Sequence, residues 1–201
     1  MNRESPLKNN KQMQIDFVHA LAEHQRAIDS VLQQSQQIEQ AVMSIIKSVD
    51  SGGKVIWLGN GGSAADAQHM AAELMVRYVK NRRPIASIAL TTDSSILTAH
   101  SNDYEFETVF ARQIEGLANP DDVVIAMSTS GKSANVVKAI EVAKDKGCFT
   151  VAMTGSAESP LNDLSDICFR VDTMETARAQ EAHSMISHLI CEGLDSVYAM
   201  E

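Results

Sequence analysis

Apolar residues recur at helical spacing over residues 11–50, a stretch that contains neither proline nor glycine. The recurring positions are Phe17, Leu21, Ile28, Val31, Leu32, Ile38, Val42, Ile45 and Ile46. This periodicity predicts one long helix or two shorter ones. The Ser51-Gly52-Gly53 segment that follows is typical of a helix end. We therefore expect an N-terminal helical segment over about 11–50.

After residue 53, short β-branched runs alternate with helical stretches. The runs predict strands at 54–58, 86–90, 122–127, 149–153 and 167–171. The helical stretches predict helices at about 64–80, 104–118, 133–146 and 175–199, with a shorter one near 94–100. This alternation predicts an α/β fold in which a five-stranded parallel sheet is flanked by helices. Because no repeat or linker interrupts the pattern, we expect a single domain over 1–201, with its α/β core over about 54–201.

The composition is that of an ordinary globular protein, with 44% hydrophobic and 21% charged residues. A chain of 201 residues can bury a substantial core. Its 17 basic and 26 acidic residues give a net charge of −9, which repels a polyanion such as nucleic acid. A small anionic ligand needs only local donors. We therefore expect a small-molecule ligand and no direct nucleic-acid partner.

The N-terminal ten residues hold no apolar run, which argues against a signal peptide or membrane span there. Cys148, Cys168 and Cys191 are far apart, odd in number and without CxxC spacing. Such cysteines suit a reducing cytosol and argue against a thiolate metal site. We expect a cytoplasmic protein with no membrane partner, in which the cysteines are small core residues.

Two loops that follow predicted strands have the composition of anion-binding sites. The first, Gly59-Asn60-Gly61-Gly62-Ser63, leads into a helix, and its glycines allow a tight turn and close approach to a ligand. The second, residues 128–133 with the sequence STSGKS, offers hydroxyls and amides that suit a phosphate monoester. Each loop alone is equally consistent with a helix cap and a turn. Both at the carboxyl ends of parallel strands favour a ligand site.

A nucleotide is the alternative ligand, because Gly59-x-Gly61-x-x-Ala64 satisfies a loose dinucleotide-binding pattern. That pattern also requires an acidic residue about 20 positions on, at the end of the next strand, to hold a ribose. The next strand ends near Asp93, which is too late in the chain, and the second loop lacks the upstream glycine of a P-loop. Nucleotide binding is therefore a weak alternative.

Polar residues on the predicted helix after the first loop could add chemistry to this site. His69 and Glu73 lie four residues apart and project from one helix face, with Asp66 one turn earlier. They could ligate a metal or place a carboxylate base beside a bound sugar. They could equally form a surface hydrogen-bonded pair, and spacing alone favours this interpretation.

The last predicted helix carries Gln180, His183 and His188 among apolar residues. Gln180 and His188 are separated by about 12 Å of helical rise. Spacing does not show which histidine faces a site. A lone histidine in a helix is more often packed or solvated, and we expect this of His24, His100 and His183.

Four separated segments, in this order, carry a family resemblance: residues 59–73, 102–103, 128–135, and 178–183 together with His188. Their sequences, GNGGSAADAQHMAAE, ND, STSGKSAN and RAQEAH, resemble the phosphoheptose isomerases, which have the sugar isomerase (SIS) fold. The resemblance covers roughly residues 15–200. It implies isomerisation of D-sedoheptulose 7-phosphate to D-glycero-D-manno-heptose 7-phosphate through an enediol, an early step toward the ADP-heptose of lipopolysaccharide cores.

The resemblance also implies a homotetramer with sites at subunit interfaces and one zinc ion per subunit. The metal ligands that it implies are His69, Glu73, Gln180 and His188. The substrate contacts that it implies are Asn60, Gly61, Gly62, Glu73, Asn102, Asp103, Ser128, Thr129, Ser130, Ser133 and Gln180. In this scheme Glu73 acts as the base and His188 as its acid partner, while zinc polarises the carbonyl and hydroxyl oxygens.

The chain departs from the family at Ala177, where some members carry an aspartate, so the substrate contact made there is in question. A relative of the same fold binds the replication initiator DnaA and does not catalyse. It lacks the glutamate and the second histidine at the metal positions, whereas this chain has Glu73 and His188, which favours the enzyme. Sugar-phosphate-sensing repressors join the fold to a DNA-binding domain, but the first 50 residues show no helix-turn-helix signal.

Overall fold

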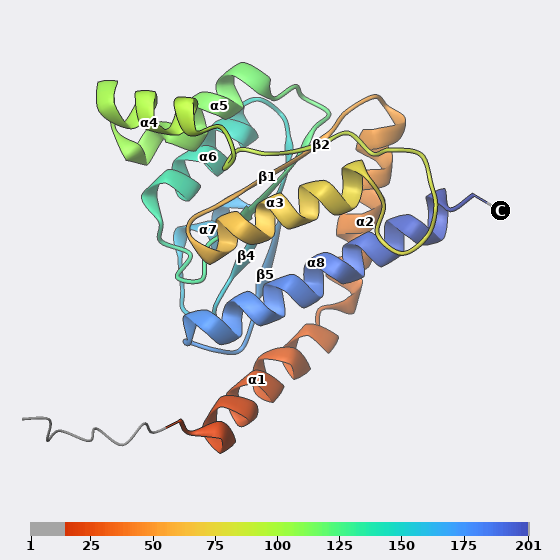
Figure 1. The fold of residues 1–201 in the computed structure, drawn as a ribbon, viewed down its shortest axis with the longest axis vertical. Helices are drawn as coiled ribbons and strands as arrows, with labels where there is room; N and C mark the ends of the chain where they lie inside the picture. Colours follow the sequence, from red (N-terminus) through yellow and green to blue (C-terminus); the bar gives the residue numbers. More distant parts are fainter. Residues whose placement is uncertain (1–14, 201) are drawn as a thin grey trace, which may run out of the picture.

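The computed structural model describes residues 15–200, so residues 11–14 of the expected helical segment lie outside the described range. The helices are α1 (Phe17–Leu32), α2 (Ser35–Asp50), α3 (Gly62–Met75), α4 (Ser94–Asp103), α5 (Val109–Leu117), α6 (Ala134–Asp145), α7 (Pro160–Leu164) and α8 (Thr176–Tyr198), with a 3-10 helix, η1, at Phe106–Thr108 (Figure 1). The strands are β1 (Val55–Gly59), β2 (Ser87–Ala89), β3 (Val123–Met127), β4 (Phe149–Thr154) and β5 (Ile167–Arg170). Within residues 15–200, every helix is too short or too polar to cross a bilayer.

The five strands form one parallel sheet in the order β2-β1-β3-β4-β5, which confirms the predicted fold class. The chain places β2 on one side of β1 and then returns to add β3, β4 and β5 on the other side. In such sheets the strand order reverses between β1 and β3, and ligands bind outside the carboxyl ends of these two strands. The loops after β1 and β3 are the two that the sequence predicts to bind an anion.

Helices cover both faces of the sheet, and successive side chains of each strand point to opposite faces. Val55 and Trp57 of β1 belong to a core with residues of α1, α2, α3 and α8. Ile56 and Leu58 belong to a second core with residues of α5, α6 and α7. Because every residue of β1 and β3 is buried, these strands read as continuous apolar runs in the sequence.

The prediction of a helix over 64–80 is wrong at its carboxyl end, because α3 stops at Met75. The guanidinium of Arg82 donates hydrogen bonds to the carbonyls of Glu73 and Leu74, at 2.6 and 2.8 Å, and so satisfies the last turn of α3. This contact comes from outside the helix, so helical periodicity could not reveal it. It also fixes the turn that carries Glu73.

A buried ion pair then ties this turn to α8. Arg82 Nε donates to Asp195 Oδ1 at 2.9 Å, and the backbone N–H groups of Val79 and Lys80 donate to Asp195 Oδ2 at 2.9 and 2.8 Å. Burial alone would raise the pKa of Asp195, but the two backbone hydrogen bonds and the guanidinium outweigh it and hold the pKa below its usual value. Asp195 is therefore ionised in the folded protein at neutral pH.

Other boundaries also differ from the predictions. The helix predicted over 104–118 begins later, as η1 followed directly by α5, because Tyr104 and Glu105 are not helical; α4 extends to Asp103. The sequence did not predict α7, whose five residues are too few for a periodic pattern. The N-terminal segment forms two helices, separated where the side chain of Gln34 exchanges hydrogen bonds with the backbone of Arg170.

Candidate functional site

The loops after β1 and β3, together with the start of α8, line a cavity of about 310 Å³. Its lining residues are Asn60, Gly61, Gly62, Ser63, Met127, Ser128, Thr129, Ser133, Thr176 and Gln180. The structure thus brings together residues that the sequence placed on three separate segments. Sequence reasoning missed Thr176, although a hydroxyl at the start of the last predicted helix was a usable signal.

The first loop brings the start of α3 to the cavity wall. Gly61 has a φ of +57°, a conformation that glycine adopts without strain. Gly62 is the first residue of α3, so the cavity meets the positive dipole end of this helix, where the N–H groups of Ser63 and Ala64 are bonded to the carbonyls of Asn60 and Gly61. A Cβ added at Gly62 would lie 2.5 Å from Nε2 of Gln180, so the absence of a side chain makes room for Gln180.

The second loop presents hydroxyls that bond to one another. Ser128 Oγ donates to Ser133 Oγ at 3.0 Å and lies 3.5 Å from Ser130 Oγ. Ser133 makes no side-chain bond to cap its own helix, so its hydroxyl serves the loop. Ser130 is not on the cavity wall, where it was expected, but accepts a hydrogen bond from the N–H of Lys132 at 3.2 Å. Ser130 is exposed, and its contact with the site is the one to Ser128.

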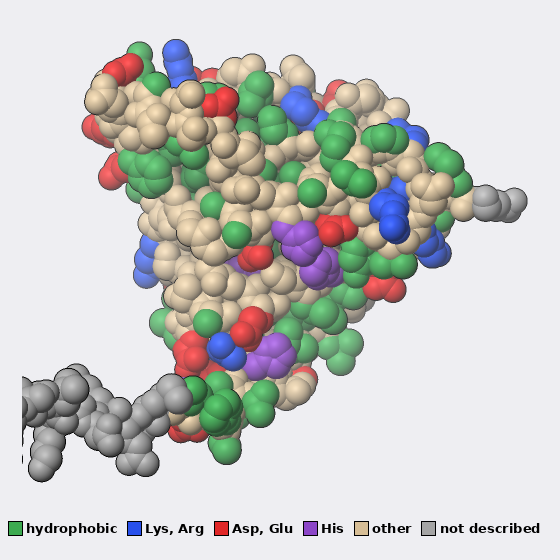
Figure 2. All heavy atoms as spheres, viewed as in Figure 1, with side chains coloured by type: hydrophobic (Ala, Val, Ile, Leu, Met, Phe, Trp, Pro, Cys, Tyr) green, Lys and Arg blue, Asp and Glu red, His purple; other side chains and the backbone are tan. Residues whose placement is uncertain are grey.

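α3 and α8 run side by side in the same direction, and histidine and acidic side chains gather at the surface between them (Figure 2). His69 Nε2 lies 3.1 Å from Glu73 Oε1. The rings of His69 and His188 meet edge to face with centroids 5.2 Å apart, and Tyr78 stacks on His188 at 5.5 Å. Sequence analysis did not single out Tyr78, because it placed this residue near the end of a helix over 64–80, whereas Tyr78 lies in the irregular segment after α3.

Asp66 lies between the cavity and this histidine cluster along the helix pair. Ser184 Oγ donates to Asp66 Oδ1 at 3.2 Å. Burial raises the pKa of Asp66, and this effect exceeds the opposing influence of the Ser184 hydrogen bond and of the charges on His69 and His188. Gln180 contacts Gly62, Ser184 contacts Asp66 and His188 contacts His69, so the two helices stay in register along the site.

His69, Glu73, Gln180 and His188 supply imidazole nitrogens and carboxylate and amide oxygens, a donor set that suits zinc. The first two are hydrogen-bonded to each other, and His188 adjoins His69. Gln180 lies eight residues before His188 on α8, about 12 Å of helical rise away, where it packs on Gly62. Within residues 15–200, no group of three or more His, Cys, Asp and Glu side chains is arranged as a metal site.

Asn102 and Asp103 do not line the cavity of their own chain. They are the last residues of α4 and are exposed, and Asn102 Nδ2 donates to Asp103 Oδ1 at 2.8 Å. One chain therefore brings together the two loops and Gln180, but it does not bring these two residues to them.

Two buried side chains near the site, those of His183 and Cys191, are uncharged at neutral pH. His183 donates from Nε2 to the carbonyl of Thr154 at 3.2 Å, and its Nδ1 has no hydrogen-bond partner. Burial lowers the pKa of His183 to about 4, which outweighs the hydrogen bond to Thr154, so the ring is neutral at pH 7. Burial raises the pKa of Cys191 to about 12, which excludes it as a thiolate nucleophile at neutral pH. These findings agree with a packed histidine and a core cysteine.

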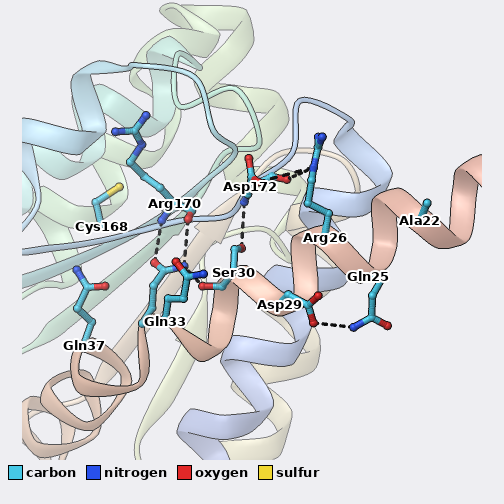
Figure 3. A pocket seen from close by; sticks show the side chains of 11 residues that line it. Ala22, Gln25, Arg26, Asp29, Ser30, Gln33, Gln37, Cys168, Arg170 and Asp172 are labelled. Carbon is cyan, nitrogen blue, oxygen red and sulfur yellow. Dashed lines mark hydrogen bonds and ion pairs between the residues drawn. The ribbon is translucent and has the colours of Figure 1, made fainter.

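A larger cavity, about 860 Å³, lies elsewhere, between α1, α2 and β5 (Figure 3). None of the predicted site residues lines it. Many of its polar groups are used to attach α1: Ser30 accepts from the N–H of Asp172 at 3.0 Å, and Arg26 donates to the Asp172 carbonyl at 3.0 Å. We therefore place the functional site at the smaller cavity, where the predicted loop residues and Gln180 converge, and on the adjacent α3–α8 surface that carries His69, Glu73 and His188.

Comparisons with known proteins agree with this placement of the motifs. Residues 17–155 match the SIS domain family. The chain is 46% identical over 179 residues to the phosphoheptose isomerase of a Nitratiruptor species, covering 89% of this chain and 96% of that protein. It is 49% identical over 158 residues to the phosphoheptose isomerase of Aquifex aeolicus, covering 79% of this chain and 83% of that protein.

A solved structure gives the same result at the level of the fold. The phosphoheptose isomerase GmhA of Neisseria gonorrhoeae superposes with a TM-score of 0.81 at 36% sequence identity, covering 89% of this chain and 96% of that one. These similarities favour the enzyme over the initiator-binding alternative. The chain belongs to the phosphoheptose isomerase family of SIS-domain proteins.

Proposed function

We propose that the protein isomerises D-sedoheptulose 7-phosphate to D-glycero-D-manno-heptose 7-phosphate. The observation that carries the proposal is the cavity between the β1 and β3 loops, together with Glu73 and His188 farther along the surface of the adjacent α3–α8 pair. The names of the most similar relatives support the same substrate class. Isomerisation of an acyclic sugar phosphate requires a phosphate-binding site at one end of the substrate and acid–base groups at the other.

The two loops would bind the phosphate. Ser128, Thr129 and Ser133 line the cavity, and the positive dipole end of α3 meets it at Gly62. Binding at one end would hold the open-chain sugar along the α3–α8 surface, so that C1 and C2 are presented to the same groups in every turnover.

Isomerisation requires that a proton leave C1 of the ketose and that a proton be delivered to C2. Glu73 is the base that takes the C1 proton and returns it to C2, and the electron pair of the broken C–H bond forms the C1=C2 bond of the enediol. His188 gives a proton to the oxygen on C2 and takes one from the oxygen on C1. No atom is lost or gained, and no external oxidant or reductant is consumed.

We infer that His69, Glu73, Gln180 and His188 hold one zinc ion per subunit. When bound, zinc would supply Lewis-acid polarisation of the substrate oxygens and so stabilise the enediolate. The nitrogen and oxygen donors of these side chains support this inference. His69 Nε2 lies 3.1 Å from Glu73 Oε1, so two of the four donors are adjacent.

We also infer a homotetramer with sites at subunit interfaces. Asn102 and Asp103 are exposed on α4, away from the cavity of their own chain, as is expected of residues that complete a neighbour's site. Phe17, Val18 and Leu21 expose apolar side chains along α1, which suits burial against another subunit. A cytoplasmic location, supported by three free cysteines, and a role in supplying ADP-heptose for lipopolysaccharide complete the proposal.

Turnover of sedoheptulose 7-phosphate with and without a chelator tests activity and metal together. We expect turnover that is lost on chelation and restored by zinc. Turnover that is unaffected by thorough chelation would contradict the zinc inference, but the proposal that the protein is an isomerase would still hold. A folded protein that shows no turnover with zinc, but captures DnaA, would contradict the isomerase.

A further inference from the structure

Asn135 is a buried amide whose side-chain partner is a residue of the other loop. It lies in the first turn of α6, just after the second loop, and only 4% of its surface is exposed. Its Nδ2 donates to Asn60 Oδ1 at 2.9 Å, and Asn60 Nδ2 donates to Asn135 Oδ1 at 2.8 Å. We call this closed ring of two hydrogen bonds the Asn60–Asn135 pair.

The Asn60–Asn135 pair connects the two walls of the cavity at the switch point. Asn60 precedes the glycines of the first loop, and Asn135 follows Ser133, whose hydroxyl is bonded to Ser128 of the second loop. β1 and β3 pair directly in the sheet up to Gly59 and Met127, and beyond those residues the second loop stays hydrogen-bonded to the end of β4 but no longer pairs with the first loop. The pair replaces strand pairing at the point where the loops would otherwise separate.

The pair also limits what the Asn60 side chain can offer a ligand. Its carbonyl oxygen and one N–H are directed at Asn135, so only its second N–H and its backbone remain for the cavity. The resemblance to phosphoheptose isomerases implies a substrate contact at Asn60. The geometry shows that this residue also has a second role, which is to hold the first loop in place.

We propose that Asn135 is a positioning residue for the phosphate seat, acting through Asn60 to set the separation of the two loops. This inference rests on the proposed function for the identity of the substrate. It does not rest on it for the presence of an anion-binding site between the two loops. A buried amide that loses its partner cannot regain water without moving its loop. Removal of Asn135 should therefore loosen the anion seat and leave the Glu73 and His188 chemistry, on other helices, intact.

The test compares Asn135→Leu, which keeps the branched shape and removes the polar group, with wild type. We expect KM for sedoheptulose 7-phosphate to rise about tenfold, because small misplacements of positioning groups have effects of this size. We expect kcat to stay within about twofold. The concentration of inorganic phosphate that half-saturates thermal stabilisation should rise by the same tenfold.

A control variant separates positioning from general loss of stability. Thr150→Val removes another buried hydrogen-bonding side chain, whose Oγ1 donates to Asp166 Oδ2 at 2.7 Å near the opposite end of the sheet. It should lower the melting temperature and leave KM and phosphate binding unchanged. If Thr150→Val raises KM as much as Asn135→Leu does, the positioning role is contradicted.

A double-mutant cycle tests whether Asn135 acts through Asn60. In an Asn60→Leu background, Asn135→Leu should raise KM by less than twofold, because the pair is already broken. An equal rise in both backgrounds would overturn the inference. If KM and phosphate binding are unchanged in Asn135→Leu, the positioning role of Asn135 is overturned. Turnover of the sugar phosphate by the wild-type protein would still support the proposed function in that case. Weakened phosphate binding without wild-type turnover of the sugar phosphate would leave the positioning role standing and contradict the proposed function.

Discussion

Gly62→Ala should damage the site while leaving the fold intact. The φ of Gly62 is not in the left-handed region, so alanine can adopt its backbone conformation. The new Cβ would lie 2.5 Å from Gln180 Nε2 and 2.8 Å from Gln180 Oε1, whereas ordinary contact begins near 3.4 Å. The end of the Gln180 side chain must therefore retreat by about 1 Å, which a flexible side chain can do without moving the helices.

The expected effect on stability is small and that on activity is large. Alanine in place of glycine stabilises by about 0.4–1 kcal/mol at a compatible position, which offsets the cost of moving Gln180. We expect the melting temperature to change by no more than about 3 °C. A displacement of about 1 Å at a positioning group costs on the order of 10–100-fold in kcat/KM, or about 1.4–2.7 kcal/mol of transition-state stabilisation.

The assay is steady-state turnover of sedoheptulose 7-phosphate, with thermal unfolding measured on the same preparations. Gly116→Ala in α5 is the matched control, because a Cβ there meets no atom within 4 Å, and it should keep full activity. In a Gln180→Ala background, Gly62→Ala should have no further effect. If Gly62→Ala keeps a kcat/KM within twofold of wild type, Gln180 has no role in the site.

Three further changes test the groups around the site. Glu73→Gln should lower kcat by about 10²–10⁴-fold at an unchanged melting temperature, because only the backbone carbonyl of Glu73 binds Arg82; near-wild-type turnover would exclude it as the base. The pKa of Asp195 is depressed, so its stabilisation is present above the unfolded pKa of about 3.9 and is lost as pH falls through the folded pKa. Asp195→Asn should make the free energy of unfolding, measured with urea, depend less on pH in the acid range. It should also lower that free energy by about 3–5 kcal/mol at pH 7, since Arg82 stays buried without a counter-ion. An unchanged dependence of the unfolding free energy on pH would contradict this. Because the folded pKa of His183 is about 4, below its unfolded pKa of 6.5, its neutral ring contributes about 3 kcal/mol above pH 6.5, and this is lost as pH falls from 6.5 to 4. The melting temperature of wild type should therefore fall more steeply than that of His183→Leu as pH is lowered over that range. Equal slopes of melting temperature against pH would refute the lowered pKa of His183.

The sheet could be predicted because its physical causes are local. Strands covered on both faces must be apolar at every position, so β1 and β3 are visible in the sequence as uninterrupted runs. The glycines and hydroxyls of the two loops are equally local signals. The end of α3 was not predictable, because Arg82 and Asp195 act on it from distant parts of the chain.

The site could be predicted only in pieces. Periodicity placed His69 and Glu73 on one face of a helix, but it could not show that α8 runs beside α3 and brings His188 against His69. Burial of Asn135 and its bonds to Asn60 likewise depend on the adjacency of β1 and β3. Long-range contacts of this kind are decided by topology, which spacing along one segment does not contain.

A crystal structure with zinc and sedoheptulose 7-phosphate, grown with the slow Glu73→Gln variant, tests the central claim most directly. We expect the phosphate within hydrogen-bonding distance of Ser128, Thr129 or Ser133, and C1 and C2 of the sugar beside residue 73 and His188 of the same or a neighbouring subunit. A sugar phosphate bound in the cavity between α1, α2 and β5, or sugar carbons that contact neither residue in any subunit, would refute this placement of the site.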